Sequence, residues 1–194
     1  MMNFYTVPFH FSLVDLMGYG FALNVDKRIR EYWLTFMKKY FTTRMEQNIL
    51  KHVFVLVDTD FFIKRFKKHP DDNQILSPHD EEMLQFLDEC YVPYSLILTK
   101  LDCINQNNYE EMESGTRIYS KNVNDTAQFE GVMNQLVPLF ESKYMIRPFV
   151  NVTSSRLGFG ITELQCTMAS IAQLFDKSDV DVTDINFMEV ANKL

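Results

Sequence analysis

Three short, almost uninterrupted runs of apolar residues constrain the fold of this chain more than any other feature. They cover His52 to Asp58, Tyr94 to Thr99 and Phe149 to Thr153. Strands without polar alternation are typical of a parallel sheet that helices cover on both faces. Longer segments with helical periodicity separate the runs, and 194 residues with 46% hydrophobic content suit one compact domain. The sequence therefore predicts an α/β fold with a mostly parallel sheet and helices on its faces.

Two further strands are predicted near the start, Asn3 to Val7 and Phe11 to Leu16, and Pro8 between them favours a hairpin. Apolar residues at steps of three and four predict four helices. The second of these begins with Ser77 as N-cap and Pro78 in its first position. The predicted helices cover Asp26 to Phe41, Ser77 to Cys90, Ala127 to Lys143 and Ile161 to Phe175.

Residues 1–175 are expected to form the domain, and residues 176–194 an acidic, weakly amphipathic tail. Two stretches interrupt the alternation of strands and helices. They are Thr59 to Leu76 and the Asn-rich segment Cys103 to Thr126, whose polarity predicts a long loop or an insertion.

Composition excludes several classes of protein. A formal net charge of -7 and a pI near 5.1 disfavour a general nucleic-acid coat. The three cysteines and four histidines show neither paired-cysteine nor metal-ligand spacing, so a reduced, intracellular chain is expected. No apolar run of about 18 residues and no signal-peptide pattern occurs, which predicts a soluble protein without a visible targeting signal.

The first candidate site follows the strand Phe11 to Leu16, where Asp15 and Gly18 form an Asp-x-x-Gly pattern. A carboxylate at the end of a strand can hold Mg²⁺ directly or through water, and a glycine beyond it can bring its N–H against a phosphate. An isolated match is more often an ordinary turn residue at the end of a strand.

The second candidate site is Thr99-Lys100-Leu101-Asp102, which follows a buried strand. At this spacing the aspartate can accept both hydrogens from the N1 and N2 edge of guanine, while the lysine stem lies along the base. Adenine does not offer that pair of donors. The alternative is a strand that ends in solvated polar residues.

The third candidate site is the sequence Thr153-Ser154-Ser155, followed by a turn that contains glycines and opens the last predicted helix. Small residues there let backbone N–H groups approach the guanine O6. A plain strand-loop-helix connection remains an alternative. All three patterns follow predicted strands, and ligands of open α/β sheets bind at the carboxyl ends of strands.

The order of these motifs is that of the later motifs of Ras-like GTPases. More narrowly, Asn3-Phe4-Tyr5 and the stretch from Val14 to Ala22 resemble the EngB/YihA family, whose pattern there is Asn-Phe-Tyr and Val-Asp-Leu-Pro-Gly-Tyr-Gly-Tyr-Ala. The similarity extends to about residue 175. It implies a three-layer, Ras-like P-loop NTPase fold and a GTP-binding role in assembly of the large ribosomal subunit.

The resemblance also implies roles for individual residues. Asp15 would help to position magnesium, and Gly18 would meet the γ-phosphate. Lys100 and Asp102 would read guanine. The nucleotide-binding set that the resemblance implies is Asp15, Gly18, Thr99, Lys100, Asp102, Thr153, Ser154 and Ser155.

The main departure from the family is the missing phosphate-binding loop, because no G-x-x-x-x-G-K-[ST] occurs in the chain. Weakened binding of GTP, GDP and Mg²⁺ and impaired hydrolysis are therefore expected. Tyr19 stands where Ras-like enzymes keep a water-orienting glutamine, so the resemblance implies slow intrinsic hydrolysis or catalysis with help from a partner. Met17 and Cys103 replace a proline and a lysine of the family pattern. Either the chain starts at an internal methionine of a longer protein, or catalysis has been lost.

The leading hypothesis is a GTP-binding protein that acts on precursors of the large ribosomal subunit, in the cytoplasm or in an organelle if a transit peptide precedes the chain. A homodimer that completes the sheet is a further possibility. The rival is a nucleotide-independent scaffold that binds ribosomal RNA or protein through the switch surface and the basic, aromatic segment Phe61 to His69. A third hypothesis is an unrelated flavodoxin-like module.

Overall fold

The structure is a computed structural model, and it describes residues 2–7, 11–16, 18, 27–59, 61, 76–103, 109–111, 117–119, 133–134 and 136–173. The elements in chain order are β1 (Asn3–Val7), β2 (Phe11–Asp15), α1 (Lys27–Glu46), β3 (Val53–Asp58), α3 (Pro78–Glu89), β4 (Tyr94–Thr99), the 3₁₀ turn η2 (Leu101–Cys103), β5 (Tyr109–Glu111), β6 (Arg117–Tyr119), β7 (Ile146–Val152) and α5 (Ile161–Ile171). Residues 133–134 and 136–142 are also helical.

The three buried apolar runs form the predicted parallel sheet, with strand order β3-β4-β7. β3 and β4 pair residue by residue from Val53 opposite Tyr94 to Asp58 opposite Thr99. β4 and β7 pair with a register shift near their start, and at their end Leu98 lies opposite Val152. The carboxyl ends of all three strands therefore meet at one edge of the sheet.

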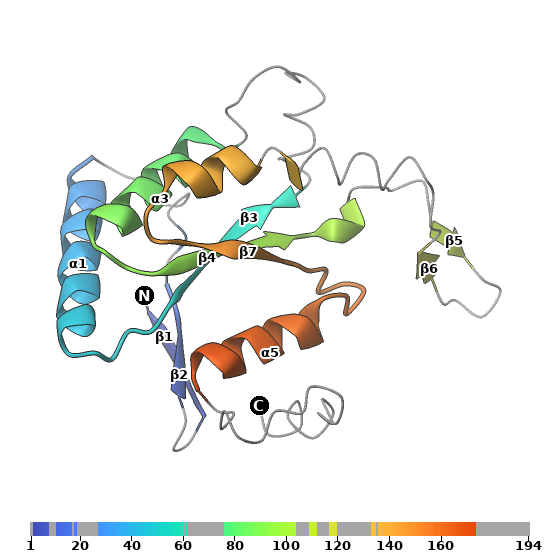
Figure 1. Cartoon of the computed structure of the whole chain (residues 1–194), viewed down its shortest axis with the longest axis horizontal. Coiled ribbons are helices and arrows are strands. Elements are labelled where there is room, and N and C mark those ends of the chain that lie inside the picture. The colour runs from blue at the N-terminus through green and yellow to red at the C-terminus, as the bar shows by residue number, and fades with distance from the viewer. Residues whose placement is uncertain are drawn as a thin grey trace.

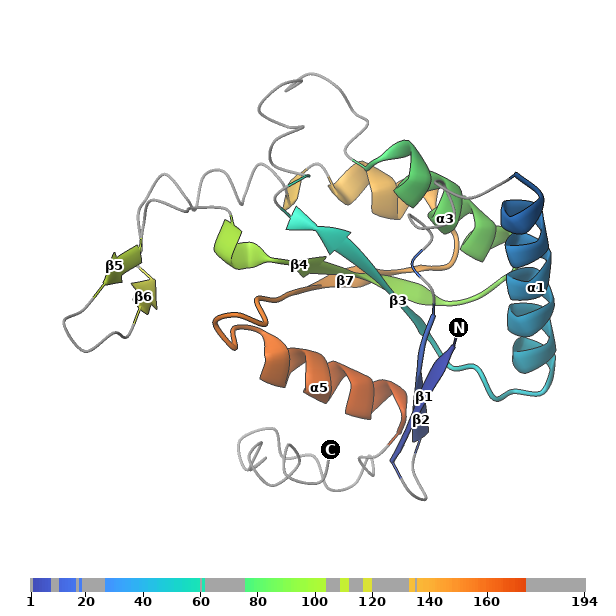
Figure 2. The same cartoon turned by 180° about the vertical axis from the view of Figure 1, so that it is seen from behind.

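Helices cover both faces of this sheet (Figures 1 and 2). On one face, alternate residues of β4 pack into a core with side chains of α1, α3 and the helical segment 136–142. That core includes Trp33, Met37, Phe41, Val55, Val57, Leu84, Leu87, Tyr94, Leu96, Leu98 and Leu136. On the other face, α5 is bonded to β7 through Asn151 Nδ2, which donates to Thr167 Oγ1 at 3.1 Å. The predicted fold class is confirmed.

The start of α3 shows how the sequence sets an element boundary. The Ser77 hydroxyl accepts from the backbone N–H of Asp80 at 3.1 Å, and the Asp80 carboxylate accepts from the Ser77 N–H at 3.2 Å. Pro78 occupies the first turn, where its missing N–H costs no hydrogen bond. This capping box satisfies two backbone donors and confirms the predicted N-cap.

Several elements differ from the prediction. β7 begins at Ile146 rather than Phe149, and α5 ends at Ile171 rather than Phe175. α1 continues to Glu46 rather than ending at Phe41, and the chain leaves it through Asn48, which has the left-handed backbone (φ 56°) common after helices. The segment 103–126, predicted to be a long loop or an insertion, contains the short antiparallel pair β5 and β6. Each of these strands has only three residues, so the sequence shows no alternating apolar pattern that could predict them.

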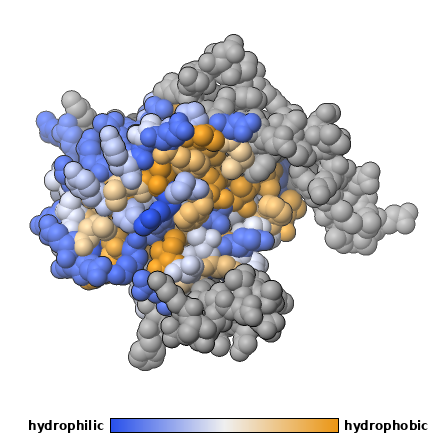
Figure 3. Space-filling model, viewed as in Figure 1, coloured by the Kyte–Doolittle hydropathy of each residue, from blue (hydrophilic) through white to orange (hydrophobic). Residues whose placement is uncertain are grey.

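The predicted hairpin is confirmed, since β1 and β2 pair antiparallel from Asn3 opposite Asp15 to Val7 opposite Phe11. Within the described residues, however, this hairpin is a sheet of its own and is not paired with β3. Leu56 of β3 lies on the face opposite the core residues Val55 and Val57, and 60% of its surface is exposed. Figure 3 shows a hydrophobic area over the middle of the parallel sheet.

His52 lies at the amino end of β3, at the edge of the sheet opposite the candidate sites. Its Nε2 lies 2.9 Å from Ser95 Oγ, and its ring meets Phe54 edge-on and stacks with Phe149. Burial, helped by the nearby Arg147 cation, lowers the pKa of His52 to about 4. The ring is therefore a neutral packing residue at physiological pH.

No helix within the described ranges is long and apolar enough to cross a membrane.

Candidate functional site

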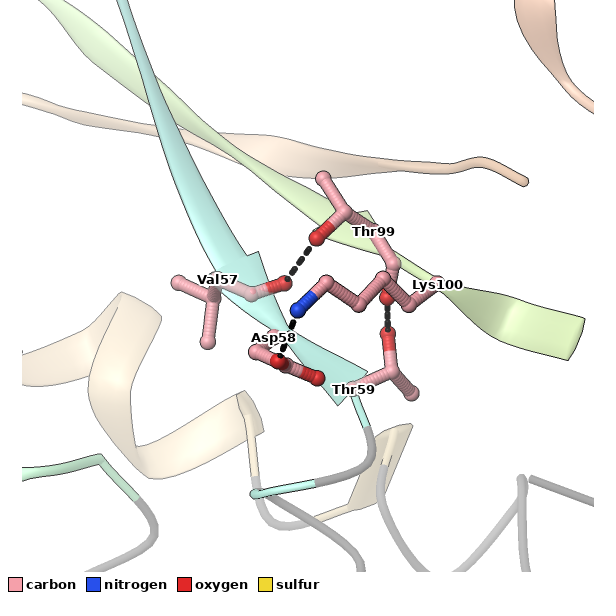
Figure 4. A network of polar contacts seen from close by, with 5 residues as sticks. All are labelled: Val57, Asp58, Thr59, Thr99 and Lys100. Atoms are coloured by element: carbon pink, nitrogen blue, oxygen red, sulfur yellow. Dashed lines mark hydrogen bonds and ion pairs between the residues drawn. The ribbon is translucent and has the colours of Figure 1, made fainter. Parts of the chain in front are cut away.

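Polar residues that follow β3 and β4 are tied to each other across the strand ends (Figure 4). Thr99 Oγ1 donates to the carbonyl of Val57 at 3.1 Å, and Thr59 Oγ1 donates to the carbonyl of Thr99 at 2.5 Å. Lys100 Nζ forms an ion pair with Asp58 Oδ2 at 2.6 Å. Each strand thus fixes the first residues beyond the end of the other.

A second set of bonds joins the end of β4 to the end of β7. The Thr153 N–H donates to the carbonyl of Leu98 at 2.7 Å, and the Leu101 N–H donates to the carbonyl of Thr153 at 3.1 Å. Between them, Lys100 has a left-handed backbone with φ 58°, which is uncommon for a residue with a side chain. The chain turns sharply after Thr99 and starts the 3₁₀ turn η2.

Asp102, in η2, is bonded to Ser154, which lies two residues beyond the end of β7. Ser154 Oγ donates to Asp102 Oδ1 at 2.6 Å, and Asp102 is 8% and Ser154 0% exposed. The Ser154 hydroxyl also accepts from the Leu157 N–H at 3.2 Å. Arg156 Nη1 lies 4.0 Å from the other carboxylate oxygen, Oδ2, on the exposed side. A carboxylate is therefore held in a buried position with one oxygen directed toward a surface cation.

The turn from β7 into α5 depends on Gly160. A Cβ at this position would lie 1.9 Å from the carbonyl oxygen of Val152, and the residue has φ +70°. The backbone of the turn therefore passes too close to β7 for any side chain. The bond from the Ser154 N–H to the carbonyl of Phe159, at 2.9 Å, closes the same turn.

The structure thus brings together Thr99, Lys100, Asp102, Thr153 and Ser154 at one edge of the sheet. Ser155, also predicted to line the site, is exposed in the turn 155–158. Two residues that the sequence did not single out, Asp58 and Thr59, belong to the same network. One signal was available, since Asp58 ends an apolar strand as Asp15 does.

Asp15 and Gly18 lie elsewhere, at the end of the hairpin strand β2 and just beyond it. Asp15 Oδ2 accepts from Asn3 Nδ2 at 3.2 Å on an exposed surface. Gly18 is exposed, and a Cβ there would meet no atom within 4 Å. Among the described residues, no group of three or more His, Cys, Asp or Glu side chains could hold a metal ion.

Two other predicted features lie largely outside the described residues. Of the basic segment Phe61 to His69 only Phe61 is described, and 47% of its surface is exposed. Tyr19 and the tail beyond residue 173 are not described. Cys90 is buried and Cys166 half-buried; both are free thiols, and burial raises the pKa of each.

Comparisons with known proteins find relatives over most of the chain. A probable GTP-binding protein EngB of Roseobacter denitrificans is 26% identical over 170 residues, which are 88% of this chain and 62% of that protein. A protein of the same name from Hyphomonas neptunium is 28% identical over 162 residues, 84% of this chain and 57% of the relative. The chain thus spans less than two thirds of the length of these curated relatives. No protein-family model matches the chain.

The fold has a close counterpart among solved structures. The crystal structure of a probable GTP-binding protein engB superimposes with a TM-score of 0.54 at 21% sequence identity, over 90% of this chain and 85% of that one. Together with the parallel sheet and its two helical layers, this defines an α/β protein of the Ras-like P-loop NTPase fold. The sequence relatives point in the same direction: over most of its length the chain is similar to proteins named probable GTP-binding protein EngB.

Proposed function

We propose that this chain binds guanine nucleotides at the edge formed by the ends of β4 and β7. The observation that supports it most is the buried Asp102, held by Ser154 Oγ at 2.6 Å directly after Thr99 and Lys100. A carboxylate fixed in this way presents acceptors for the two donors on the N1 and N2 edge of guanine, a pair that adenine lacks. The relatives are named as probable GTP-binding proteins, which supports this role.

Arg156 affects how tightly a base could bind. Its guanidinium lies 4.0 Å from Asp102 Oδ2, the carboxylate oxygen that is not bonded to Ser154, and its side chain is 61% exposed. A guanine that donates to Asp102 would have to displace this contact. Because the arginine is exposed, the cost of moving it is small.

The phosphates and magnesium would be bound weakly. The chain has no phosphate-binding loop to surround the β-phosphate, and Asp15 offers one carboxylate where Mg²⁺ prefers six oxygen ligands. Asp15 could therefore hold Mg²⁺ only together with a bound nucleotide. The phosphates of the nucleotide and water would supply the remaining oxygen ligands of the ion. Gly18 would supply a backbone N–H. Hydrolysis would then be slow or absent.

The cellular role we propose is assembly of the large ribosomal subunit, in the cytoplasm or in an organelle. The family resemblance supports this role, with the precursor of the subunit as partner. The working unit would be the domain formed by residues 1–175, and residues 176–194 would be a tail.

A second copy of the chain would be suited to complete the sheet. In the described part of the chain, β3 pairs only with β4, and its Leu56 side chain is 60% exposed. A strand edge next to an exposed apolar side chain favours pairing with another chain. Light scattering at several concentrations would show whether a dimer forms.

The decisive experiment is titration of the 194-residue chain with fluorescent GDP and GTP in the presence of Mg²⁺, with ATP as competitor. Micromolar binding that ATP does not compete for is the expected result. In the Asp102→Asn variant, guanine nucleotides should bind about tenfold to a hundredfold more weakly, since a charged hydrogen-bond acceptor is lost, and selectivity should relax toward xanthine nucleotides.

A matched control is Glu89→Gln, which also removes one negative charge. Glu89 is exposed at the end of α3, where its side chain accepts from Gln85. Unchanged guanine selectivity in Asp102→Asn, or an equal loss in the control, would contradict the assignment.

A further inference from the structure

We propose that Asp58 is a positioning residue that holds Lys100 in the orientation a bound guanine requires. The inference rests on the proposed function. Asp58 is the last residue of β3, and its carboxylate meets the Lys100 ammonium at 2.6 Å across the strand ends (Figure 4). None of the three motifs found in the sequence includes this residue.

The backbone beneath the pair is fixed on both sides. Thr99 Oγ1 bonds to the carbonyl of Val57, and Thr59 Oγ1 bonds to the carbonyl of Thr99, so the residues before and after Asp58 are tied to β4. Asp58 and Thr99 are also direct partners in the strand register. The backbone that carries the Asp58 carboxylate is therefore held in place by the sheet.

The backbone of Lys100 is equally constrained. Its φ of 58° places it in the left-handed region, where a residue with a side chain is strained. The following N–H, of Leu101, donates to the carbonyl of Thr153 and holds the turn in place. With both ends anchored, the lysine side chain reaches from the end of β4 to the end of β3, so its apolar stem is held in one place.

The ion pair contributes little to the stability of the fold. The Lys100 side chain is 61% exposed and that of Asp58 39% exposed, and pairs open to water to this degree are weak. Its effect on a ligand is larger, because a long lysine side chain loses rotamer freedom when a base packs against it. A lysine already held by Asp58 has lost that freedom before the base arrives.

The test uses the full 194-residue chain and fluorescent GDP, with four variants: Asp58→Asn, Lys100→Ala, the double variant, and Glu89→Gln as the control for charge. Asp58→Asn should weaken binding by roughly threefold to tenfold, the usual effect of losing one preorganised side chain. The midpoint of thermal unfolding should stay within about a degree. Selectivity for guanine over xanthine should be retained, since Asp102 is intact.

The double variant separates positioning from a general effect. If Asp58 acts through Lys100, adding Asp58→Asn to Lys100→Ala should weaken binding no further than Lys100→Ala alone. Full additivity, unchanged or tighter binding in Asp58→Asn, or the same loss in Glu89→Gln would overturn the inference while leaving the proposed function intact. A wild-type chain that binds no GDP would instead remove the proposed function and this inference together.

Discussion

Two regions of this protein end an apolar strand in an aspartate, but they hold that aspartate in different ways. At the ends of β4 and β7, Asp102 is 8% exposed and bonded to Ser154, a residue from a different strand. At the end of β2, Asp15 is exposed and bonded to Asn3 of its own hairpin. Pairing within one sheet therefore fixes the side chains that follow β4 and β7, whereas the hairpin leaves its aspartate on an exposed surface.

Gly160→Ala should break the preformed region most severely. The new Cβ would meet the Val152 carbonyl oxygen at 1.9 Å, and the backbone has φ +70°. Clash and strain together should lower the free energy of unfolding by roughly 3 kcal/mol or more. Chemical denaturation followed by circular dichroism measures this change.

Gly158→Ala is the matched control for Gly160→Ala. Gly158 has nearly the same φ, +68°, but a Cβ there meets no atom within 4 Å. Only the backbone strain remains, so a loss of about 1 kcal/mol is expected. Equal losses in the two variants would show that the contact with Val152 is not what makes Gly160 necessary.

Ser154→Ala should loosen the site without removing its carboxylate. The variant loses the buried 2.6 Å bond to Asp102 and the acceptor for the Leu157 N–H, which is part-buried. Leaving such groups without their partner should destabilise the fold by about 1–3 kcal/mol. Thermal unfolding measures the loss, and Ser155→Ala, one residue further on the exposed turn, should change stability by less than about 0.5 kcal/mol.

The elements that sequence reasoning located well are those with a strong local signal. β4 matches its predicted bounds because an apolar run between polar residues leaves little choice, and α3 starts where Ser77 and Pro78 cap it. α1 was predicted too short, since its last turn carries few apolar residues. The separation of the hairpin from β3 could not be predicted, because pairing between strands depends on the whole chain.

The site was only partly visible in the sequence for the same reason. The motif Thr-Lys-x-Asp singled out Lys100, but the partner of Lys100, Asp58, lies 42 residues earlier. Likewise, Arg156 approaches Asp102 only because β4 and β7 are neighbours. Spacing identifies residues that act from one loop, while contacts between loops require the fold. The nucleotide-binding roles themselves stay predictions.

Asp15→Ala should have the smallest effect on the fold. This variant tests the aspartate of the hairpin, as the variants above test the region around Asp102. Its one described bond, to Asn3 at 3.2 Å, is exposed, so the free energy of unfolding should change by less than about 0.5 kcal/mol. If Asp15 helps to hold magnesium, the variant should lose the dependence of GDP and GTP binding on Mg²⁺ instead. Titrations with fluorescent nucleotide, with Mg²⁺ and with chelator, measure this dependence.

Asn3→Ala is the control, because it removes the same hydrogen bond and keeps the carboxylate, so its magnesium dependence should match the wild type. Binding that is equally tight with and without Mg²⁺ in the wild type and in Asp15→Ala would show that Asp15 has no such role.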